Sequence, residues 1–192
     1  MNIDQIRSLD GEALQLLRGD VQALTSADLD RPTPCAGWSV SDLLDHMTVE
    51  HLAIVGQPAA VDGTSAGTSQ ERFEAGCDRW LEYFATAPAR VHIPSFGADV
   101  PVERVLAVHF ADMIVHRWDL AAALGVPCDV DPRLLERADA VADFATAADS
   151  PLVGEAAAYR PALPADPNAT PLQNLVRRYG RDHQWAATEP EQ

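Results

Sequence analysis

The stretch VERVLAVHFADMIVHRWDLAAALG, residues 102–125, places three ionisable side chains on what should be the buried face of one helix. At about 100° per residue, Asp112 and His116 lie within roughly 60° of His109 on the helical wheel. The apolar residues on the same side are Val102, Val105, Leu106, Met113 and Leu120. Two imidazoles and a carboxylate inside an apolar stripe are costly unless each has a partner. The pattern therefore predicts either a bound divalent metal or hydrogen-bonded His–Asp pairs, and the spacing leaves both open.

The spacing of these residues favours ligands that converge on one point. Asp112 and His116 are four residues apart, so both side chains can reach the same place above the helix surface. Imidazole nitrogen and carboxylate oxygen are a usual ligand set for zinc and similar divalent ions. A third ligand must come from another helix, and His46 in SDLLDHMTVE (41–50) is the best candidate. Glu50 is left open as a fourth ligand, a general base or a half-buried carboxylate.

Helical periodicity extends outward from this stretch in both directions. Pro32, Pro34 and Gly37 predict a turn in which Cys35 is a small buried residue, and Ser39 with Asp42 predicts a sharp helix start. The segment RVHIPSFGADV, residues 90–100, is the only strand-like patch and predicts a hairpin or an extended loop. Helices are expected over residues 3–27 with an interruption near Gly11 left open, 40–55, 70–87, 101–124, 132–148 and 171–179.

These elements predict an all-α fold in two parts. Residues 1–150 should form a four-helix bundle that carries the candidate metal-binding residues, with a flexible loop at 63–69. Residues 151–192 should form a proline-rich strap, a short helix and a tail that pack on the bundle.

Composition excludes several classes of protein. The chain has 14 basic and 29 acidic residues, and this net charge of −15 argues against nucleic-acid binding. No apolar run is long enough for a membrane span, and the polar start of the chain is unlike a leader peptide, so a cytoplasmic protein is expected. Three widely spaced cysteines without a CxxC pair predict neither a disulfide framework nor a thiolate zinc site.

Three segments resemble one known family when they are read together. TPCAGWSVSDLLDH (33–46), HFADMIVHRWDLAAALG (109–125) and PADPNATPLQNLVRRYGRDHQW (164–185) are similar to the actinobacterial branch of the DinB-like superfamily. The named member of that branch is the mycothiol-dependent maleylpyruvate isomerase, through its N-terminal metal-binding domain. The resemblance implies an up-down-down-up four-helix bundle that holds one divalent metal, often zinc or nickel.

Carried over by position, the resemblance implies that His46, Asp112 and His116 are the metal ligands. Asp112 stands where the isomerase has a glutamate. His109 would then be a nearby second-shell or substrate-facing residue. The isomerase carries a larger C-terminal domain, in place of which this chain has only the strap, the short helix and the tail.

The leading functional hypothesis is a mycothiol-dependent, or other thiol-dependent, transferase or isomerase that acts on a small electrophilic substrate. Glu50 and His109 are the candidates to shuttle protons. The alternatives are a metal-dependent hydrolase on the same scaffold, a non-catalytic metal-stabilised binding module, and a metal-free bundle. The expected partners are the substrate and the thiol, without nucleic acid or membrane, and a homodimer is left open.

Overall fold

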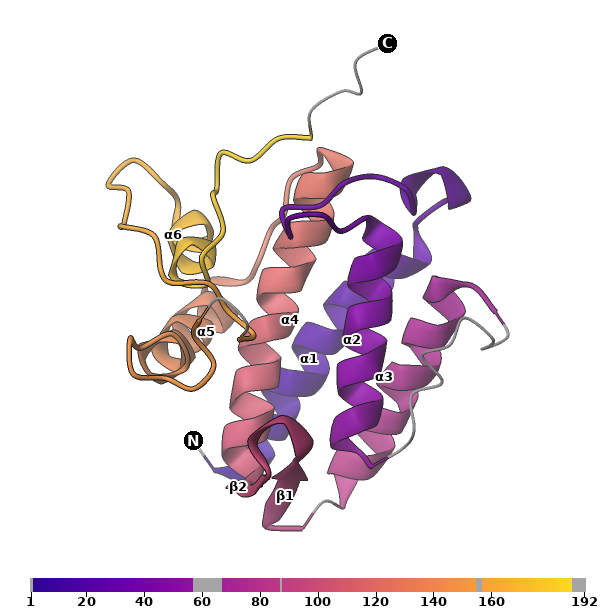
Figure 1. The fold of residues 1–192 in the computed structure, drawn as a ribbon, viewed down its shortest axis with the longest axis vertical. Coiled ribbons are helices and arrows are strands. Elements are labelled where there is room, and N and C mark those ends of the chain that lie inside the picture. The colour runs from indigo at the N-terminus through magenta and orange to yellow at the C-terminus, as the bar shows by residue number, and fades with distance from the viewer. Residues whose placement is uncertain (1, 57–66, 87, 155–156, 188–192) are drawn as a thin grey trace.

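The computed structural model describes residues 2–56, 67–86, 88–154 and 157–187. The predicted helical class is confirmed, with one small antiparallel sheet beside the helices (Figure 1). None of the described helices combines the length and the apolar character that crossing a membrane requires. The elements are α1 (Ile3–Gln22), α2 (Val40–Ile54), α3 (Ser69–Ala85), β1 (Arg90–Ile93), β2 (Ala98–Pro101), α4 (Val102–Leu124), α5 (Pro132–Ala145) and α6 (Pro171–Arg178).

The first helix is shorter than predicted. It begins at a reciprocal cap between Asn2 and Gln5 and runs past Gly11 without interruption. It ends at Gln22, because Thr25 caps a separate short 3₁₀ turn at Ser26–Asp28. The predicted end at residue 27 was therefore wrong: the capping group at Thr25 starts a new turn instead of extending the helix.

The start of α2 is confirmed where the sequence placed it. The Ser39 amide donates to the Asp42 carboxylate at 2.9 Å, and the Asp42 amide donates back to the Ser39 hydroxyl at 3.2 Å. The turn before it is closed by a bridge between Pro32 and Ser39. This reciprocal cap fixes the direction in which α2 leaves the turn, and with it the position of His46.

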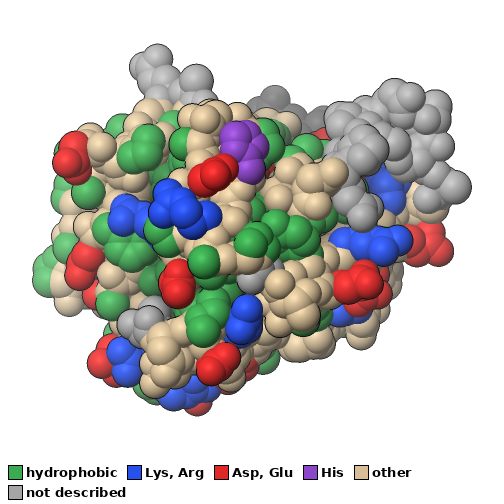
Figure 2. All heavy atoms as spheres, turned by 90° about the horizontal axis from the view of Figure 1, so that it is seen from below, with side chains coloured by type: hydrophobic (Ala, Val, Ile, Leu, Met, Phe, Trp, Pro, Cys, Tyr) green, Lys and Arg blue, Asp and Glu red, His purple; other side chains and the backbone are tan. Residues whose placement is uncertain are grey.

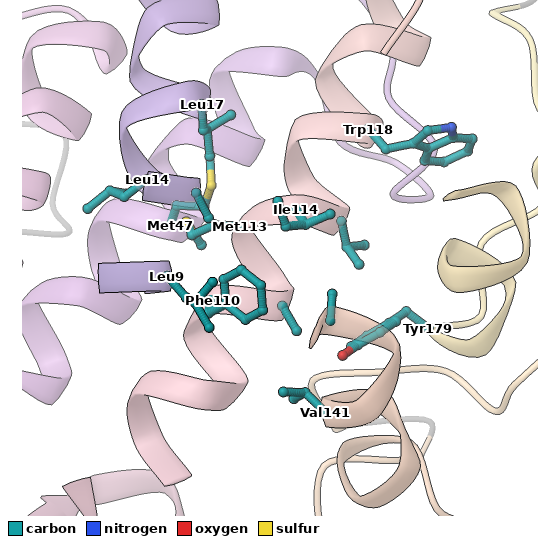
Figure 3. Packing of buried hydrophobic residues seen from close by; sticks show 14 of the residues in the cluster. Leu9, Leu14, Leu17, Met47, Phe110, Met113, Ile114, Trp118, Val141 and Tyr179 are labelled. Carbon is teal, nitrogen blue, oxygen red and sulfur yellow. The ribbon is translucent and has the colours of Figure 1, made fainter. Parts of the chain in front are cut away.

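Helix α4 is the central element of the fold. It ends at Gly125, whose positive φ of 69° closes the helix in the left-handed conformation that glycine adopts without strain. The α1 helix packs against α4 and α3, α2 packs against α3, and α5 packs against α4. Figure 1 shows α1 to α4 running alongside one another. Apolar side chains from these helices fill the space between them (Figure 3), among them Leu14, Leu17, Met47, Phe110 and Met113.

The predicted hairpin is confirmed at β1 and β2, which pair in antiparallel register with Val91 opposite Val100. The ends of α3 and α5 lie two to three residues before the predicted ends, because Thr86 and Thr146 take the C-cap positions. Most of the predicted 63–69 loop lies outside the described residues.

The C-terminal segment is held in shape by hydrogen bonds within itself. The Tyr159 amide donates to the Leu152 carbonyl at 2.8 Å, and the Leu163 amide donates to the Arg177 carbonyl at 2.9 Å. The α6 helix packs against α5 and α4. Residues from this segment therefore reach the same side of α4 that carries His116.

Charged side chains are mixed over the surface. Figure 2 shows acidic and basic side chains interspersed with apolar ones on the face seen from below. On that face the negative charge of the chain is spread out, as is common for a charge that serves solubility.

Candidate functional site

One cavity of about 1490 Å³ brings together every side chain that the sequence nominated. Its walls come from the turn before α2, from α2 itself, from the hairpin, from α4 and from the C-terminal segment. The nominated residues that line it are His46, Glu50, His109, Asp112 and His116. A space of this volume holds more than one small molecule at a time.

His116 is held on the cavity wall by two carboxylates. It is only 3% exposed, and each ring nitrogen faces a carboxylate on its own helix. Its Nδ1 donates to Asp119 at 3.0 Å, and its Nε2 lies 3.3 Å from Asp112 Oδ2. Burial alone would lower the pKa of His116, but Asp112 and Asp119 outweigh it and raise that pKa to about 9. Burial likewise opposes ionisation of Asp112, yet His116 holds its pKa well below the usual value.

Asp119 contacts the C-terminal segment and the turn before α2. This fully buried carboxylate accepts a hydrogen bond from Arg181 Nη2 at 3.1 Å and one from the Cys35 thiol at 3.5 Å. Burial first, and then Asp119, raise the pKa of Cys35 to about 12, so the thiol stays protonated. Cys35 supports the turn through this hydrogen bond, but it is half-buried and lines the cavity, whereas the sequence predicted a buried residue. Asp119 also fixes the ring of His116, because a carboxylate on one imidazole nitrogen orients the other.

His46 approaches the same place from α2. Its ring centroid lies 5.8 Å from that of His116 and 4.7 Å from that of Trp38. Burial, and then the charge of His116, lower the pKa of His46 to about 4, which leaves its ring neutral at pH 7. Glu50 lines the cavity one turn further along α2, where burial and the nearby Asp112 raise its pKa. A neutral imidazole is the form that binds metals, and a carboxyl with a raised pKa is suited to proton transfer.

His109 belongs to a second network, which the sequence did not anticipate. Its Nδ1 bonds to Asp10 on α1, and its Nε2 lies 2.8 Å from His51 Nε2 on α2. Asp10 also accepts a hydrogen bond from Trp80 Nε1 on α3 at 2.9 Å, and the Trp80 ring stacks on His109 with centroids 3.8 Å apart. This network therefore links α1, α2, α3 and α4 through buried polar groups.

The far end of that network lies against α3. His51 Nδ1 has no hydrogen-bond partner among the described residues. A Cβ on Gly76 would lie 3.6 Å from that nitrogen, an ordinary van der Waals contact, so position 76 of α3 faces His51. Burial, and then His109, hold the pKa of His51 well below its ordinary value. His109 still lines the cavity, but its two ring nitrogens are engaged away from Asp112 and His116.

The donor groups around His116 fit a divalent metal once His116, which is protonated at pH 7 in the metal-free protein, releases its Nε2 proton to the binding ion. Asp112 Oδ1 is buried and has no partner among the described residues, and His116 has the carboxylate support that metal-binding histidines usually have. His46 supplies a neutral nitrogen from the opposite wall. Among the described side chains, one group has three possible ligand atoms within 4.8 Å of one another, and His46 does not belong to that group.

That group consists of Cys35, His116 and Asp119. Arg181 lies 3.7 Å from the Cys35 sulfur and 3.1 Å from Asp119, and its positive charge would repel a cation placed between them. The chemistry of the donors therefore favours the Asp112 side of His116 over the Asp119 side.

Sequence reasoning missed Asp10, Asp119 and Arg181. Asp119 was within reach, since it follows His116 by one helical turn and therefore lies on the same face. Asp10 follows Ile6 by four residues on the apolar side of α1. The sequence could therefore have predicted that this carboxylate is buried, but not which group it bonds. Arg181 lies in a polar tail, and nothing in the local pattern distinguishes it from a solvated side chain.

The titration of His116 predicts how the stability of the metal-free protein depends on pH. Its folded pKa of about 9 exceeds the unfolded value of 6.5, so the stabilisation is complete below pH 6.5 and is lost as pH rises toward 9. His46 and His51 shift the other way and act below pH 6.5. We expect the free energy of unfolding to fall by about 1.5 kcal/mol between pH 6.5 and about pH 8.

Urea unfolding of metal-free protein across this range measures the effect. The His116→Gln variant should lose the slope, and an equal slope in wild type and variant would contradict the assignment. The window ends near pH 8 because cysteine thiols of the unfolded chain begin to ionise above it.

Fold and site together define a mostly helical protein in which a buried cluster of histidines and aspartates lines one large cavity. Comparison with known sequences places it more closely: the chain belongs to the family described as mycothiol maleylpyruvate isomerase N-terminal domain, which matches residues 11–121. The resemblance inferred from its motifs is thereby confirmed.

Two relatives are uncharacterised proteins from two strains of Mycobacterium tuberculosis. Each is 32% identical to this chain over 117 residues, a match that covers 55% of this chain and 60% of the relative. The match thus spans less than two thirds of the length of these relatives. No solved structure matches the chain.

Proposed function

We propose that His46, Asp112 and His116 bind one divalent metal ion, zinc or nickel, in a protein that uses a low-molecular-weight thiol. In this proposal helices α1 to α4 form the up-down-down-up bundle of the DinB-like superfamily. Residues 1–150 make up that bundle, and residues 151–192 are packed on it. The observation that carries the proposal is His116, which has Asp119 on one ring nitrogen and the incompletely partnered Asp112 on the other.

The activity proposed for this site is transfer or isomerisation of a small electrophile through a thiol such as mycothiol. The name of the matched family supports mycothiol as the thiol. A bound divalent ion would lower the pKa of a thiol that coordinates it. Trp38 packs against the His46 ring, and Asp119 with Arg181 holds His116 in place. A carboxylate oxygen of Glu50 receives the proton that the thiol releases as the carbon–sulfur bond forms. In epoxide opening or addition to an alkene, Glu50 returns this proton to the oxygen or carbon left with negative charge, and in displacement of a halide the proton leaves with the halide.

The cavity supports a reaction between two molecules. Its volume admits a thiol and a small electrophile together, and much of its wall is apolar, including Met47, Ile93 and Val105. Apolar walls exclude water, which would otherwise compete with the thiol for the electrophile. The carboxyl group of Glu50, the proposed proton acceptor, lies on the wall of the same cavity.

The proposal predicts an activity that needs metal and thiol together. Zinc-loaded, nickel-loaded and metal-free protein are incubated with mycothiol and, separately, an alkyl halide, an epoxide and an activated alkene. We expect thiol consumption above the rate in buffer alone only in a metal-loaded sample, and we expect Glu50→Gln to slow the catalysed part by about 10²-fold or more, the usual contribution of a general base.

The controls separate the alternatives. His92→Ala removes an exposed histidine that does not line the cavity and should leave the rate unchanged. Turnover that needs metal but no thiol would replace the thiol-dependent reaction by a hydrolase. Absence of thiol consumption with every electrophile in metal-loaded protein would contradict the proposed activity.

A further inference from the structure

Two tyrosines from the C-terminal segment reach the Asp112 side of the cavity. Tyr159 follows the proline-rich strap and is 3% exposed, and Tyr179 follows α6 and is fully buried. Both line the cavity together with Asp112. Figure 3 shows Tyr179 reaching from the end of α6 toward α4 and Val141 of α5. Both lie beyond residues 11–121, the part that matches the family.

The chain is built to hold these two rings against each other. Their centroids lie 4.8 Å apart with the planes nearly perpendicular, at 85°. Gly180 permits this approach: its φ is +77°, and a Cβ there would lie 2.7 Å from Arg160 Cβ and 3.0 Å from the Arg160 carbonyl oxygen. Any larger residue would push the strap away from the end of α6. The backbone of Tyr159 is fixed in turn by its hydrogen bonds to Leu152 and Gly154.

Two polar atoms at this place lack partners. Tyr179 Oη and Asp112 Oδ1 are both buried, and neither has a hydrogen-bond partner among the described residues. A buried hydroxyl without a partner costs free energy that a phenylalanine would not cost. A tyrosine is therefore expected here only if its hydroxyl meets a partner that arrives from the cavity.

The charges around this place favour a neutral partner. Burial first, and then the nearby Asp112, raise the pKa of both tyrosines above the ordinary value, so both hydroxyls remain donors at pH 7. In metal-free protein the Asp112 carboxylate would repel an anionic group placed beside it. The positive charge of Arg181 is already engaged by Asp119. A carbonyl or hydroxyl oxygen suits this environment better than a carboxylate does.

We propose that Tyr179, supported by Tyr159, donates a hydrogen bond to a neutral carbonyl or hydroxyl oxygen of the molecule bound beside Asp112. This oxygen belongs either to the thiol or to the electrophile, and in naming those molecules the inference rests on the proposed function. The C-terminal segment thus completes a binding site whose other residues come from α2 and α4. Tyr179 is a ligand-binding residue, and Gly180 is a positioning residue that acts through it.

The first test measures binding and stability of the same variant. Calorimetric titration of zinc-loaded protein with mycothiol is compared for wild type, Tyr179→Phe and Tyr83→Phe, a control on α3 outside the cavity. We expect Tyr179→Phe to raise the mycothiol Kd about tenfold if the oxygen is on the thiol. If the oxygen is on the electrophile, that Kd stays unchanged and the KM for the electrophile rises instead. Tyr83→Phe should change neither.

The melting temperature separates a ligand-binding hydroxyl from a structural one. In ligand-free protein, Tyr179→Phe should leave the melting temperature unchanged or raise it, since no internal hydrogen bond is lost. A clear drop would show that the hydroxyl serves the fold, and this would overturn the inference. Unchanged Kd and KM together would overturn it as well.

A second probe makes the inference independent of the thiol. Acetamide supplies a neutral carbonyl and needs neither metal nor mycothiol. The inference predicts a saturable shift of the Gly180 amide NMR signal in wild type that is lost in Tyr179→Phe. If acetamide binds and mycothiol does not, the result supports the Tyr179 hydrogen bond and contradicts the proposed thiol-dependent function. If acetamide gives no saturable shift in wild type, the Tyr179 hydrogen bond is contradicted, whether or not mycothiol binds.

Discussion

Replacing Asp10 by alanine is expected to lower the free energy of unfolding by about 3–5 kcal/mol, the largest effect on stability that this fold predicts for one side chain. Asp10 is 2% exposed and is bonded to two other buried groups, His109 Nδ1 and Trp80 Nε1. Alanine would leave both nitrogens without a partner in a place that excludes water. Each such loss costs about 1–3 kcal/mol, and the removed negative charge adds to it.

Urea unfolding monitored by tryptophan fluorescence measures this loss, since Trp80 lies inside the network. Asp4→Ala is the matched control, because Asp4 lies on the same helix with a side chain that is 88% exposed. The control should change stability by no more than about 0.5 kcal/mol. Asp10→Asn keeps the size and one acceptor, so its loss should fall between those of Asp4→Ala and Asp10→Ala. Equal stability of Asp10→Ala and wild type would contradict the described network.

Replacing His116 by glutamine is expected to weaken zinc binding by at least about 100-fold. His116 is the proposed ligand that has a carboxylate on each side, so its loss would remove a donor and leave Asp119 without its role in orienting that donor. Glutamine retains hydrogen-bonding capacity toward the two aspartates, which limits the accompanying loss of stability. Competition with a chromophoric chelator gives the affinity directly.

Two further variants complete this test. His46→Ala removes the proposed ligand on α2 and should weaken zinc binding by a similar factor, although His46 shares no hydrogen bond with His116 in the described contacts. His92→Ala should bind zinc as wild type does, because His92 is exposed on β1 and is not on the cavity wall. Retained affinity in both His46→Ala and His116→Gln would contradict the proposed ligands.

Features that depend on neighbours along the chain were predicted well from sequence. The reciprocal cap at Ser39 and Asp42, the hairpin at residues 90–101 and the glycine end of α4 each follow from residues a few positions apart. The errors lie at the ends of α1, α3 and α5. There the last turn depends on competition between a threonine cap and one more helical hydrogen bond, which helical periodicity does not reveal.

Partners from distant parts of the chain could not be predicted in this way. The periodicity of α4 correctly put His109 on its buried face, but the bonded partners of that ring are Asp10 and His51, 99 and 58 residues away. Arg181 meets Asp119 across 62 residues, and only packing of the C-terminal segment brings the two together. Periodicity shows that a polar group is buried, whereas its partner depends on how the helices pack.

The central claim concerns the position of a metal ion, and anomalous diffraction from a crystal grown with zinc tests it most directly. Data collected on both sides of the zinc absorption edge locate the ion without assumptions about its ligands. We predict a single strong peak about 2.0–2.2 Å from the donor atoms of His46, Asp112 and His116. A peak between Cys35 and Asp119, or no peak on the cavity wall, would contradict the account.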